Sequence, residues 1–236
     1  MKKTLIILFA FFILGCDKKE IKLPTIGEKG LQELHNHSQV WMFFEIKGTD
    51  TILNLNKKNT ISTTHWVFNV DKRLSLKRII PSIITLQDKH ANSIHAKEGM
   101  HNYFSYSDTI SQQLSFLEFD NILFKTDSLE SKQYIKSNSG SYLNYYNINL
   151  RFSPSKIWIN ETIIDKNEFK STLLEFIQFT SEGKQTMLHL NFNQNLIYQD
   201  YLFYKTMISN LKSPTILVNN LEFIFDQNKV PNCGCD

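Results

Sequence analysis

Two hydrophobic periodicities follow one another in the second half of the chain. Apolar and polar residues alternate in residues 148–152 and 156–160, on either side of a Ser-Pro-Ser turn, and this pattern predicts a β-hairpin. In the next segment the apolar positions recur every three or four residues, which predicts an amphipathic helix. Asp165 and Glu168 have the spacing of a capping box at its start. The buried face of this helix is predicted to carry Phe169, Leu173, Phe176 and Ile177.

Three more elements are predicted after Gly183. Residues 186–192 alternate as a strand, residues 199–211 have an apolar stripe at helical spacing, and residues 215–218 form a strand after Pro214. The order from residue 147 onward is therefore β-β-α-β-α-β. This order is typical of an α+β fold with one sheet and two helices on one face.

The first half of the chain repeats part of this order. Residues 40–46, 51–55 and 65–70 are rich in aromatic and β-branched residues and are predicted to be strands. Helical spacing of apolar residues begins at Ser75, and Pro81 indicates either the start of the helix or a kink. We expect a short closing strand at residues 92–96.

Two short segments resemble each other at a separation of 122 residues. Residues 69–74 (Asn-Val-Asp-Lys-Arg-Leu) and 191–196 (Asn-Phe-Asn-Gln-Asn-Leu) share two of six positions, and each lies between a predicted strand and an amphipathic helix. We therefore predict a degenerate tandem repeat of two small sheet-plus-helix units. The first copy lacks the first helix, because only nine residues separate Leu55 from His65.

The N-terminus has the organisation of a secretory signal. A basic start precedes an eleven-residue apolar run from Thr4 to Leu14, shorter than the about 20 residues that a membrane-spanning helix needs. The sequence Ile13-Leu14-Gly15-Cys16 resembles the lipobox of bacterial lipoproteins. The resemblance implies cleavage before Cys16, acyl chains on that cysteine and a lipid-anchored location in a bacterial cell envelope. The alternative is an ordinary signal peptide with an unrelated cysteine, and the membrane and its face stay open.

These features divide the chain into six consecutive parts. We predict a signal peptide (1–15), a polar tether (16–36), a first α+β unit (37–110), a connecting segment (111–146), a second α+β unit (147–228) and a cysteine-containing tail (229–236).

Charge argues against nucleic acid as a partner. The formal net charge is +3, only three of the 26 basic residues are Arg, and removal of Lys2 and Lys3 with the signal leaves +1. Nucleic-acid-binding proteins instead concentrate basic residues on one face and use Arg for bidentate contacts.

The second unit resembles the periplasmic domain of the ExbD/TolR biopolymer-transport family. The resemblance rests on Ile157-Trp158-Ile159-Asn160-Glu161, on the helix after Asp165, on residues 188–196 with Tyr198, and on Ile216-Leu217-Val218. It implies a small unit that dimerises and binds extended segments of energy-transducing partners. Members of the family also carry a membrane-spanning helix with an acidic residue for proton flow. The lipobox stands in its place here, so a proton-channel role is not expected. The alternative is an unrelated α+β lipoprotein.

Residues with catalytic or metal-binding chemistry form no recognised motif. The seven His lack metal-site spacing and are expected to be exposed and polar, and Glu118 with Asp120 fits the solvent face of a strand. We therefore predict no catalytic residue, no metal and no cofactor. Cys233 and Cys235 are expected in a loose tail, with a disulfide, an intermolecular link or soft-metal binding as alternatives.

The leading hypothesis is a non-enzymatic envelope lipoprotein that binds proteins, as an accessory to biopolymer transport. An extended partner would add to the sheet edge at Ile216, Leu217 and Val218. The expected partners are the membrane, through the lipid, envelope proteins and a second copy of the chain. One alternative is a hydrolase of glycan or peptide with a cleft between the units, which converging carboxylates or histidines in a deep pocket would favour. A second is metal handling by Cys233 and Cys235.

Overall fold

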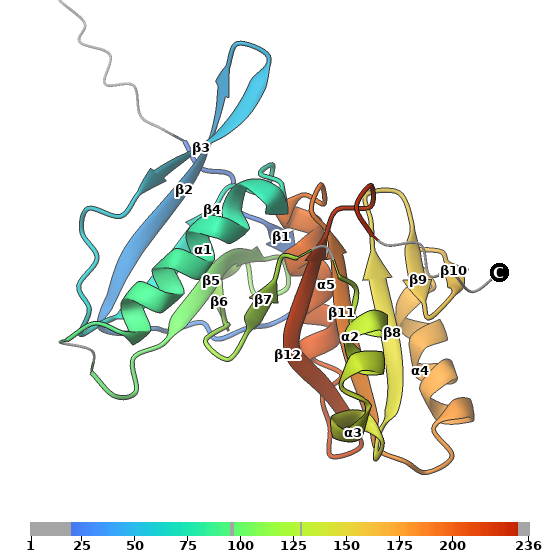
Figure 1. Cartoon of the computed structure of the whole chain (residues 1–236). Coiled ribbons are helices and arrows are strands. Elements are labelled where there is room, and N and C mark those ends of the chain that lie inside the picture. The colour runs from blue at the N-terminus through green and yellow to red at the C-terminus, as the bar shows by residue number, and fades with distance from the viewer. Residues whose placement is uncertain (1–19, 95–96, 128, 231–236) are drawn as a thin grey trace, which may run out of the picture.

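Two mixed β-sheets with helices packed against them make up the part of the chain that the computed structural model describes, residues 20–94, 97–127 and 129–230 (Figure 1). The sequence-based prediction of an α+β fold with two sheet-plus-helix units is confirmed. Cys16, Cys233 and Cys235 lie outside the described residues. Among the described residues, no helix is long and apolar enough to cross a membrane.

The first sheet has the strand order β1-β5-β4-β2-β3, and β6 pairs with β5. Parallel pairing joins β2 to β4, β4 to β5 and β1 to β5, whereas β3 and β6 are antiparallel to their neighbours. Helix α1 covers one face (Figure 1). The elements are β1 (Thr25–Ile26), β2 (His37–Lys47), β3 (Asp50–Asn56), β4 (His65–Val70), α1 (Leu76–Ala91), β5 (Asn102–Asp108) and β6 (Gln113–Glu118).

The second sheet has the order β10-β9-β8-β11-β12-β7, with β8, β11, β12 and β7 parallel. Helices α4 and α5 pack on one face, and the short helices α2 and α3 lie over the other (Figure 1). The elements are β7 (Leu123–Lys125), α2 (Ser131–Ser137), α3 (Ser139–Tyr142), β8 (Tyr146–Phe152), β9 (Ile157–Ile159), β10 (Thr162–Ile164), α4 (Phe169–Thr180), β11 (Thr186–Asn193), α5 (Tyr198–Ser209) and β12 (Ile216–Phe225).

The two units share the arrangement that the repeat predicts. Strands β2, β4 and β5 with helix α1 correspond to β8, β11 and β12 with helix α5, and residues 57–64 of the described chain contain no counterpart of α4. An antiparallel bridge joins Ser75 to Ile197, which are themselves 122 residues apart. The two units therefore contact each other at equivalent residues of the repeat.

Backbone hydrogen bonds at this bridge come in reciprocal pairs. The Leu76 N–H donates to the Leu196 carbonyl (3.0 Å), and the Tyr198 N–H donates to the Leu74 carbonyl (2.7 Å). Each bond becomes the other when the units are exchanged, as a two-fold axis requires. The two units therefore form an internal pseudo-dimer about the first turns of α1 and α5.

The repeated segments have the same turn chemistry. The Arg73 N–H donates to Asp71 Oδ1 (3.1 Å), and the Asn195 N–H donates to Asn193 Oδ1 (2.8 Å). Side-chain bonds of this kind to the backbone two residues on stabilise the turn that leads from strand to helix. This local requirement explains why the two segments resemble each other.

One continuous hydrophobic core joins the units. Phe104 of β5 stacks on Phe119 with ring centroids 3.7 Å apart and makes edge contacts with Tyr198 and Tyr201 of α5. All four side chains are buried, and the cluster that contains them extends through both sheets. The sheets thus fold around a shared core.

Several predicted elements differ from the structure. The closing strand of the first unit is β5. In the predicted strand at residues 92–96, Asn92 is the C-cap of α1 and residues 93–94 form no strand, while residues 95–96 lie outside the described part of the chain. Helix α4 begins at Phe169 with Glu168 as its N-cap, and Asp165 instead accepts a bond from the Asn167 N–H, so the predicted capping box is wrong. Pro81 lies inside α1, which begins at Leu76.

Segments expected to lie outside the units also join the sheets. Ile26, in the predicted tether, is buried in β1. The predicted connecting segment supplies β6 to the first sheet and β7 to the second, because each adds to an otherwise open strand. The turn at Asn160-Glu161 separates β9 from β10, so the second unit has one strand more than predicted.

Candidate functional site

The strand edge predicted to bind partners lies on β12 and is partly covered. β7 pairs with this edge only at Leu221, Glu222 and Phe223. Nearer the start of β12, the N–H and carbonyl of Ile216 both bond to Ser213. Residues 217–220 remain as a short open stretch beside a groove of about 390 Å³, which Met187, Lys212, Ile216, Leu217 and Val218 help to line. Of the three predicted residues, Leu217 and Val218 thus lie on an open sheet edge of only four residues, and Ile216 does not.

A longer open edge lies on β3, which sequence patterns did not single out. β3 pairs with β2 over all seven of its residues and ends the strand order of the first sheet. The two strands extend beyond the rest of the sheet as a hairpin (Figure 1). Gly48, at φ +64°, occupies the first central position of the two-residue turn, which matches a tight hairpin turn. We call this hairpin, residues 37–56, the β2–β3 arm.

The arm carries an aromatic pair on the face opposite α1. The rings of Trp41 and Phe43 lie 6.1 Å apart and within 9° of parallel, and both are half-buried. Their cross-strand partners are Asn56 and Asn54. Near the tip, Ile46 is 66% exposed. The outward-facing side chains could not be predicted from the near-continuous apolar run of residues 40–46, because β2 has apolar residues on both faces.

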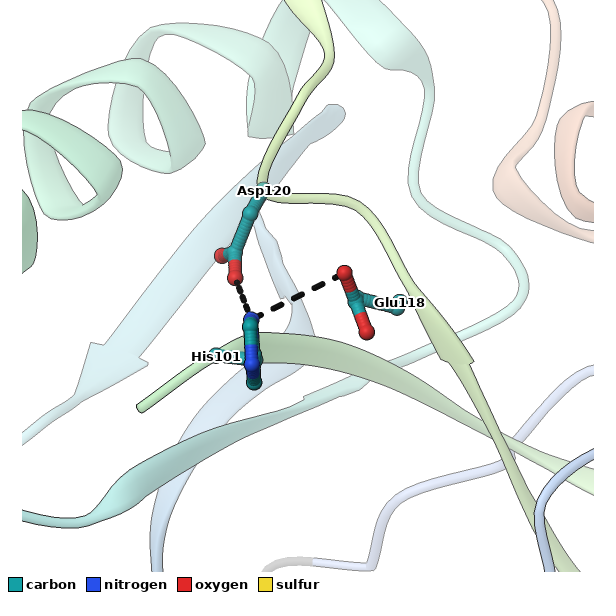
Figure 2. Close-up of side chains that lie close together, drawn as sticks. All are labelled: His101, Glu118 and Asp120. Carbon is teal, nitrogen blue, oxygen red and sulfur yellow. Dashed lines mark hydrogen bonds and ion pairs between the residues drawn. The ribbon is translucent and has the colours of Figure 1, made fainter. Parts of the chain in front are cut away.

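A histidine and two carboxylates converge beside β5 and β6. His101 Nδ1 lies 2.7 Å from Asp120 Oδ2 and 3.7 Å from Glu118 Oε1 (Figure 2). The three ligand atoms lie within 4.8 Å of one another. Antiparallel pairing places Glu118 opposite Tyr103, two residues after His101. This register brings the three residues together across the sheet. We call them the His-Glu-Asp cluster.

Asp120 is held in place by Asn102. Its Oδ1 accepts bonds from the Asn102 backbone N–H (2.7 Å) and from Asn102 Nδ2 (2.6 Å). Asn102 in turn contacts the buried His90, whose Nδ1 lies 2.9 Å from Asn102 Oδ1 and whose Nε2 donates to the Thr64 carbonyl (3.0 Å). These bonds occupy one oxygen of Asp120 and leave the other directed at His101.

A second histidine stacks on the cluster. The ring of His65 lies 5.7 Å from that of His101 at 12°, and His65 Nδ1 accepts a bond from the His101 backbone N–H (3.0 Å). Burial lowers the pKa of His65, and the neighbouring His101 lowers it further. Burial, followed by the charges of Glu118 and Asp120, raises the pKa of Tyr103. The cluster is thus a region of negative potential with a neutral imidazole beside it.

The cluster lines a cavity of about 900 Å³ at the junction of the two units. The end of α1 and residues 97–100 form other walls of the cavity. The second sheet and its helix α2 contribute Phe124 of β7, Tyr134 of α2 and Leu221 of β12. The alternation of Glu118 and Asp120 predicts a solvent face and gives no sign of a partner, because His101 comes close to them only after β5 and β6 pair.

Of the six histidines that the structure describes, His35 and His37 are exposed, as predicted, and His65 and His101 are partly buried. The prediction is wrong at His90 and His189, which are buried, and His95 lies outside the described residues. His90 is 4% exposed, and its ring stacks on Trp66 with centroids 4.3 Å apart. His189 of β11 is fully buried between Asn147 and Asn219, and burial lowers its pKa to about 4. Both side chains are held by hydrogen bonds in the interior, because their neighbours in the fold supply amide or carbonyl groups.

Comparison with known proteins yields no family, because no protein-family model, curated protein or solved structure matches the chain.

Proposed function

We propose that this protein is a non-enzymatic lipoprotein of the bacterial cell envelope that binds an extended segment of a protein partner along the edge of β3. The accessory role in biopolymer transport that the ExbD/TolR resemblance implies belongs to the same proposal. The edge of β12 at residues 217–220 is a second, shorter place for such binding.

The open edge of β3 is the observation that carries the proposal. In an antiparallel pair every second residue directs its N–H and carbonyl away from the partner strand. Since Lys47 and Asp50 close a two-residue turn, these residues on β3 are Thr51, Leu53 and Leu55. A partner strand would therefore meet three donor–acceptor pairs, enough for edge addition over about six residues.

The sequence of β3 lacks the usual protection of an edge. Free edges in soluble proteins commonly carry Lys, Pro or a bulge, which prevent unwanted pairing. β3 reads Asp-Thr-Ile-Leu-Asn-Leu-Asn and pairs with β2 without a shift in register. Trp41, Phe43 and Ile46 add apolar surface next to it. Aromatic side chains of this kind commonly supply much of the binding energy of an interface.

Site-specific photo-crosslinking in cells tests this proposal. A photoreactive phenylalanine at Trp41 or Ile52 should yield a discrete crosslinked envelope protein. The same group at Ile94, which is 97% exposed, should not. The double substitution Ile52→Lys with Asn54→Lys places two lysines on the edge strand and should abolish the crosslink formed by the photoreactive residue at position 41. The control substitution Ile94→Lys should leave that crosslink unchanged.

Hydrogen exchange with the captured partner identifies the edge that is used. Binding along β3 should slow amide exchange at Thr51, Leu53 and Leu55. Protection at residues 217–220 alone would move the binding site to β12. If crosslinks were as strong at Ile94 as at Trp41, or if no amide of either edge gained protection, edge addition would be refuted.

Lipidation is tested separately. The mature protein should begin with an acylated Cys16, visible by mass spectrometry, and Cys16→Ser should release the chain from the membrane fraction. Stable attachment is expected because several acyl chains bind a membrane far more tightly than one. A Cys16→Ser chain that stays in the membrane fraction would contradict the lipobox prediction.

A hydrolase is the second candidate function, and the His-Glu-Asp cluster favours it. Convergent titratable groups in a cavity between two units are the arrangement that an active site requires. Cell-wall glycan and envelope peptides should then be cleaved by the purified chain, and Asp120→Asn should abolish the cleavage. Equal turnover by Asp120→Asn and the unaltered chain would exclude this site as its source.

A further inference from the structure

We infer that His101, Glu118 and Asp120 bind a divalent transition-metal ion of the zinc type. The inference goes beyond partner binding at β3, because the cluster lies beside β5 and β6 and shares no residue with the β2–β3 arm.

The imidazole nitrogen of His101 has nearly the spacing to both carboxylates that a metal requires. Bonds of about 2.0–2.2 Å to imidazole nitrogen and carboxylate oxygen place neighbouring ligand atoms roughly 3.0–3.5 Å apart. His101 Nδ1 lies 2.7 Å from Asp120 Oδ2 and 3.7 Å from Glu118 Oε1 (Figure 2). The carboxylate oxygens of Glu118 and Asp120 lie within 4.8 Å of each other, so binding one ion requires these oxygens to move closer together by up to about 1.5 Å.

The surroundings hold the ligands in a binding orientation. Asn102 occupies Asp120 Oδ1 with two hydrogen bonds, which leaves Oδ2 for a metal. His65 stacks on the His101 ring and accepts the bond from its backbone N–H. Such supporting contacts orient metal ligands and commonly change metal affinity about 10–100-fold when removed. The Nδ1 lone pair of His101 becomes available when the ring proton is on Nε2.

The chemistry of the cluster favours a zinc-type ion over Ca²⁺ or Mg²⁺. Imidazole is a good ligand for first-row transition metals, whereas Ca²⁺ and Mg²⁺ prefer oxygen ligands alone. Two carboxylates neutralise the charge of a divalent cation. Three protein ligands also leave coordination positions for water or a ligand, as in zinc sites that carry out chemistry. All three side chains line the cavity of about 900 Å³, so these positions are accessible from it.

Titration of the full chain with ZnCl₂, in detergent and after removal of metal, tests the inference. The titration is done in a Cys233→Ser, Cys235→Ser background, which excludes the two cysteines of the tail as ligands. We expect one Zn²⁺ per chain and a higher melting temperature with metal. His101→Ala and Asp120→Asn should each weaken binding by at least about 100-fold, more than the loss of a supporting contact.

The matched control is His35→Ala, which removes an exposed histidine outside the cluster and should leave the affinity unchanged. Substitution by Co²⁺ gives a second measurement, because its visible spectrum should report nitrogen and oxygen ligands without thiolate. The melting temperature and circular dichroism of each variant without metal show whether it is folded.

Three results would overturn the inference. These are no Zn²⁺ binding by the background chain, equal affinity of His101→Ala and His35→Ala, and a Co²⁺ spectrum that His101→Ala leaves unchanged. None of them bears on partner capture at the β2–β3 arm, so the two proposals can fail independently.

Discussion

The two units solve the same packing problem with different chemistry. In the first unit, Phe104 of β5 pairs with Phe68 of β4. In the second, the residue equivalent to Phe68 is Leu190, and its partner on β12 is Glu222. Glu222 is fully buried and accepts bonds from Lys205 and from the Tyr201 hydroxyl (2.8 Å). Lys205 stands 122 residues after Ile83 of α1. The ion pair of Lys205 and Glu222 in the second unit therefore occupies the places that the apolar residues Ile83 and Phe104 hold in the first.

The same contrast recurs on the other face of the sheets. Val67 is buried in the first unit, and its equivalent in the second is His189, held between Asn147 and Asn219. The fold therefore accepts either solution at these positions. The two solutions differ in the effect of a substitution on stability. Replacing one residue of an apolar pair removes packing contacts, whereas replacing one residue of a polar pair leaves its partner buried without a hydrogen bond or counter-charge.

Removal of one partner from the buried ion pair is the largest effect we predict. Glu222→Ala should lower the free energy of unfolding by about 3–5 kcal/mol, because it leaves the Lys205 ammonium buried without a counter-charge. The double variant Lys205→Met with Glu222→Leu, which copies the apolar solution of the first unit, should come within about 1.5 kcal/mol of the unaltered chain. Urea unfolding measures both.

The control is the partly exposed pair between Lys166 and Asp200 (3.0 Å), which joins the loop before α4 to α5. Lys166→Met should cost less than about 1 kcal/mol, because exposed ion pairs contribute little. If Glu222→Ala cost no more than Lys166→Met, the buried pair would not be the structural difference that we describe.

His189 should make stability depend on pH. Its pKa is about 4 in the folded protein, below the ordinary 6.5, because burial disfavours the charged ring. The unfolded chain therefore binds more protons between these values. Stability is fully present above pH 6.5 and should fall by about 3 kcal/mol as the pH drops to 4.

The substitution His189→Asn keeps polar groups in the sheet and removes the titration. Its unfolding free energy should change about 3 kcal/mol less between pH 6.5 and 4 than that of the unaltered chain. Val67→Ala, at the equivalent position, should leave the pH dependence as it is. A His189→Asn chain with the original pH profile would contradict burial of a neutral imidazole.

The smallest effect is expected in the repeated turn. Asp71 is equivalent to Asn193, but it also forms an ion pair with Arg73 (2.8 Å). Burial favours a higher pKa for Asp71, and the bonds from Arg73 and from the Lys22 N–H outweigh it, so the pKa is lowered. Asp71→Asn keeps the turn and should cost about 1 kcal/mol at pH 7, since Arg73 is partly exposed.

Because the pKa of Asp71 is lowered, its contribution is present above about pH 4 and is lost as the pH falls below its unfolded pKa. The difference between Asp71→Asn and the unaltered chain should therefore shrink in acid, as chemical unfolding at pH 7 and pH 3 would measure. A difference that grew in acid would show that the ion pair does not stabilise the turn.

Local patterns were sufficient for much of the fold. The strands around residues 40–70, the helices α1, α4 and α5, and the tandem repeat all follow from hydrophobic period and turn chemistry, which act over a few residues. Errors occurred where tertiary contacts override local preference. The closing strand of the first unit forms at Asn102–Asp108, because these residues pair with β4 on one side and β6 on the other.

The candidate sites likewise fall into two groups, those that local sequence indicates and those that depend on tertiary pairing. By itself, the sequence determined the two-unit organisation and a final strand at Ile216, Leu217 and Val218, and it predicts a signal at the N-terminus. Only the tertiary structure decided that β7 covers part of that strand, that β3 is the longer open edge, and that His101 meets Glu118 and Asp120. The physical reason is register: a pairing between β5 and β6 brings side chains 17 and 19 residues apart within hydrogen-bond or ion-pair distance, and no local period encodes it.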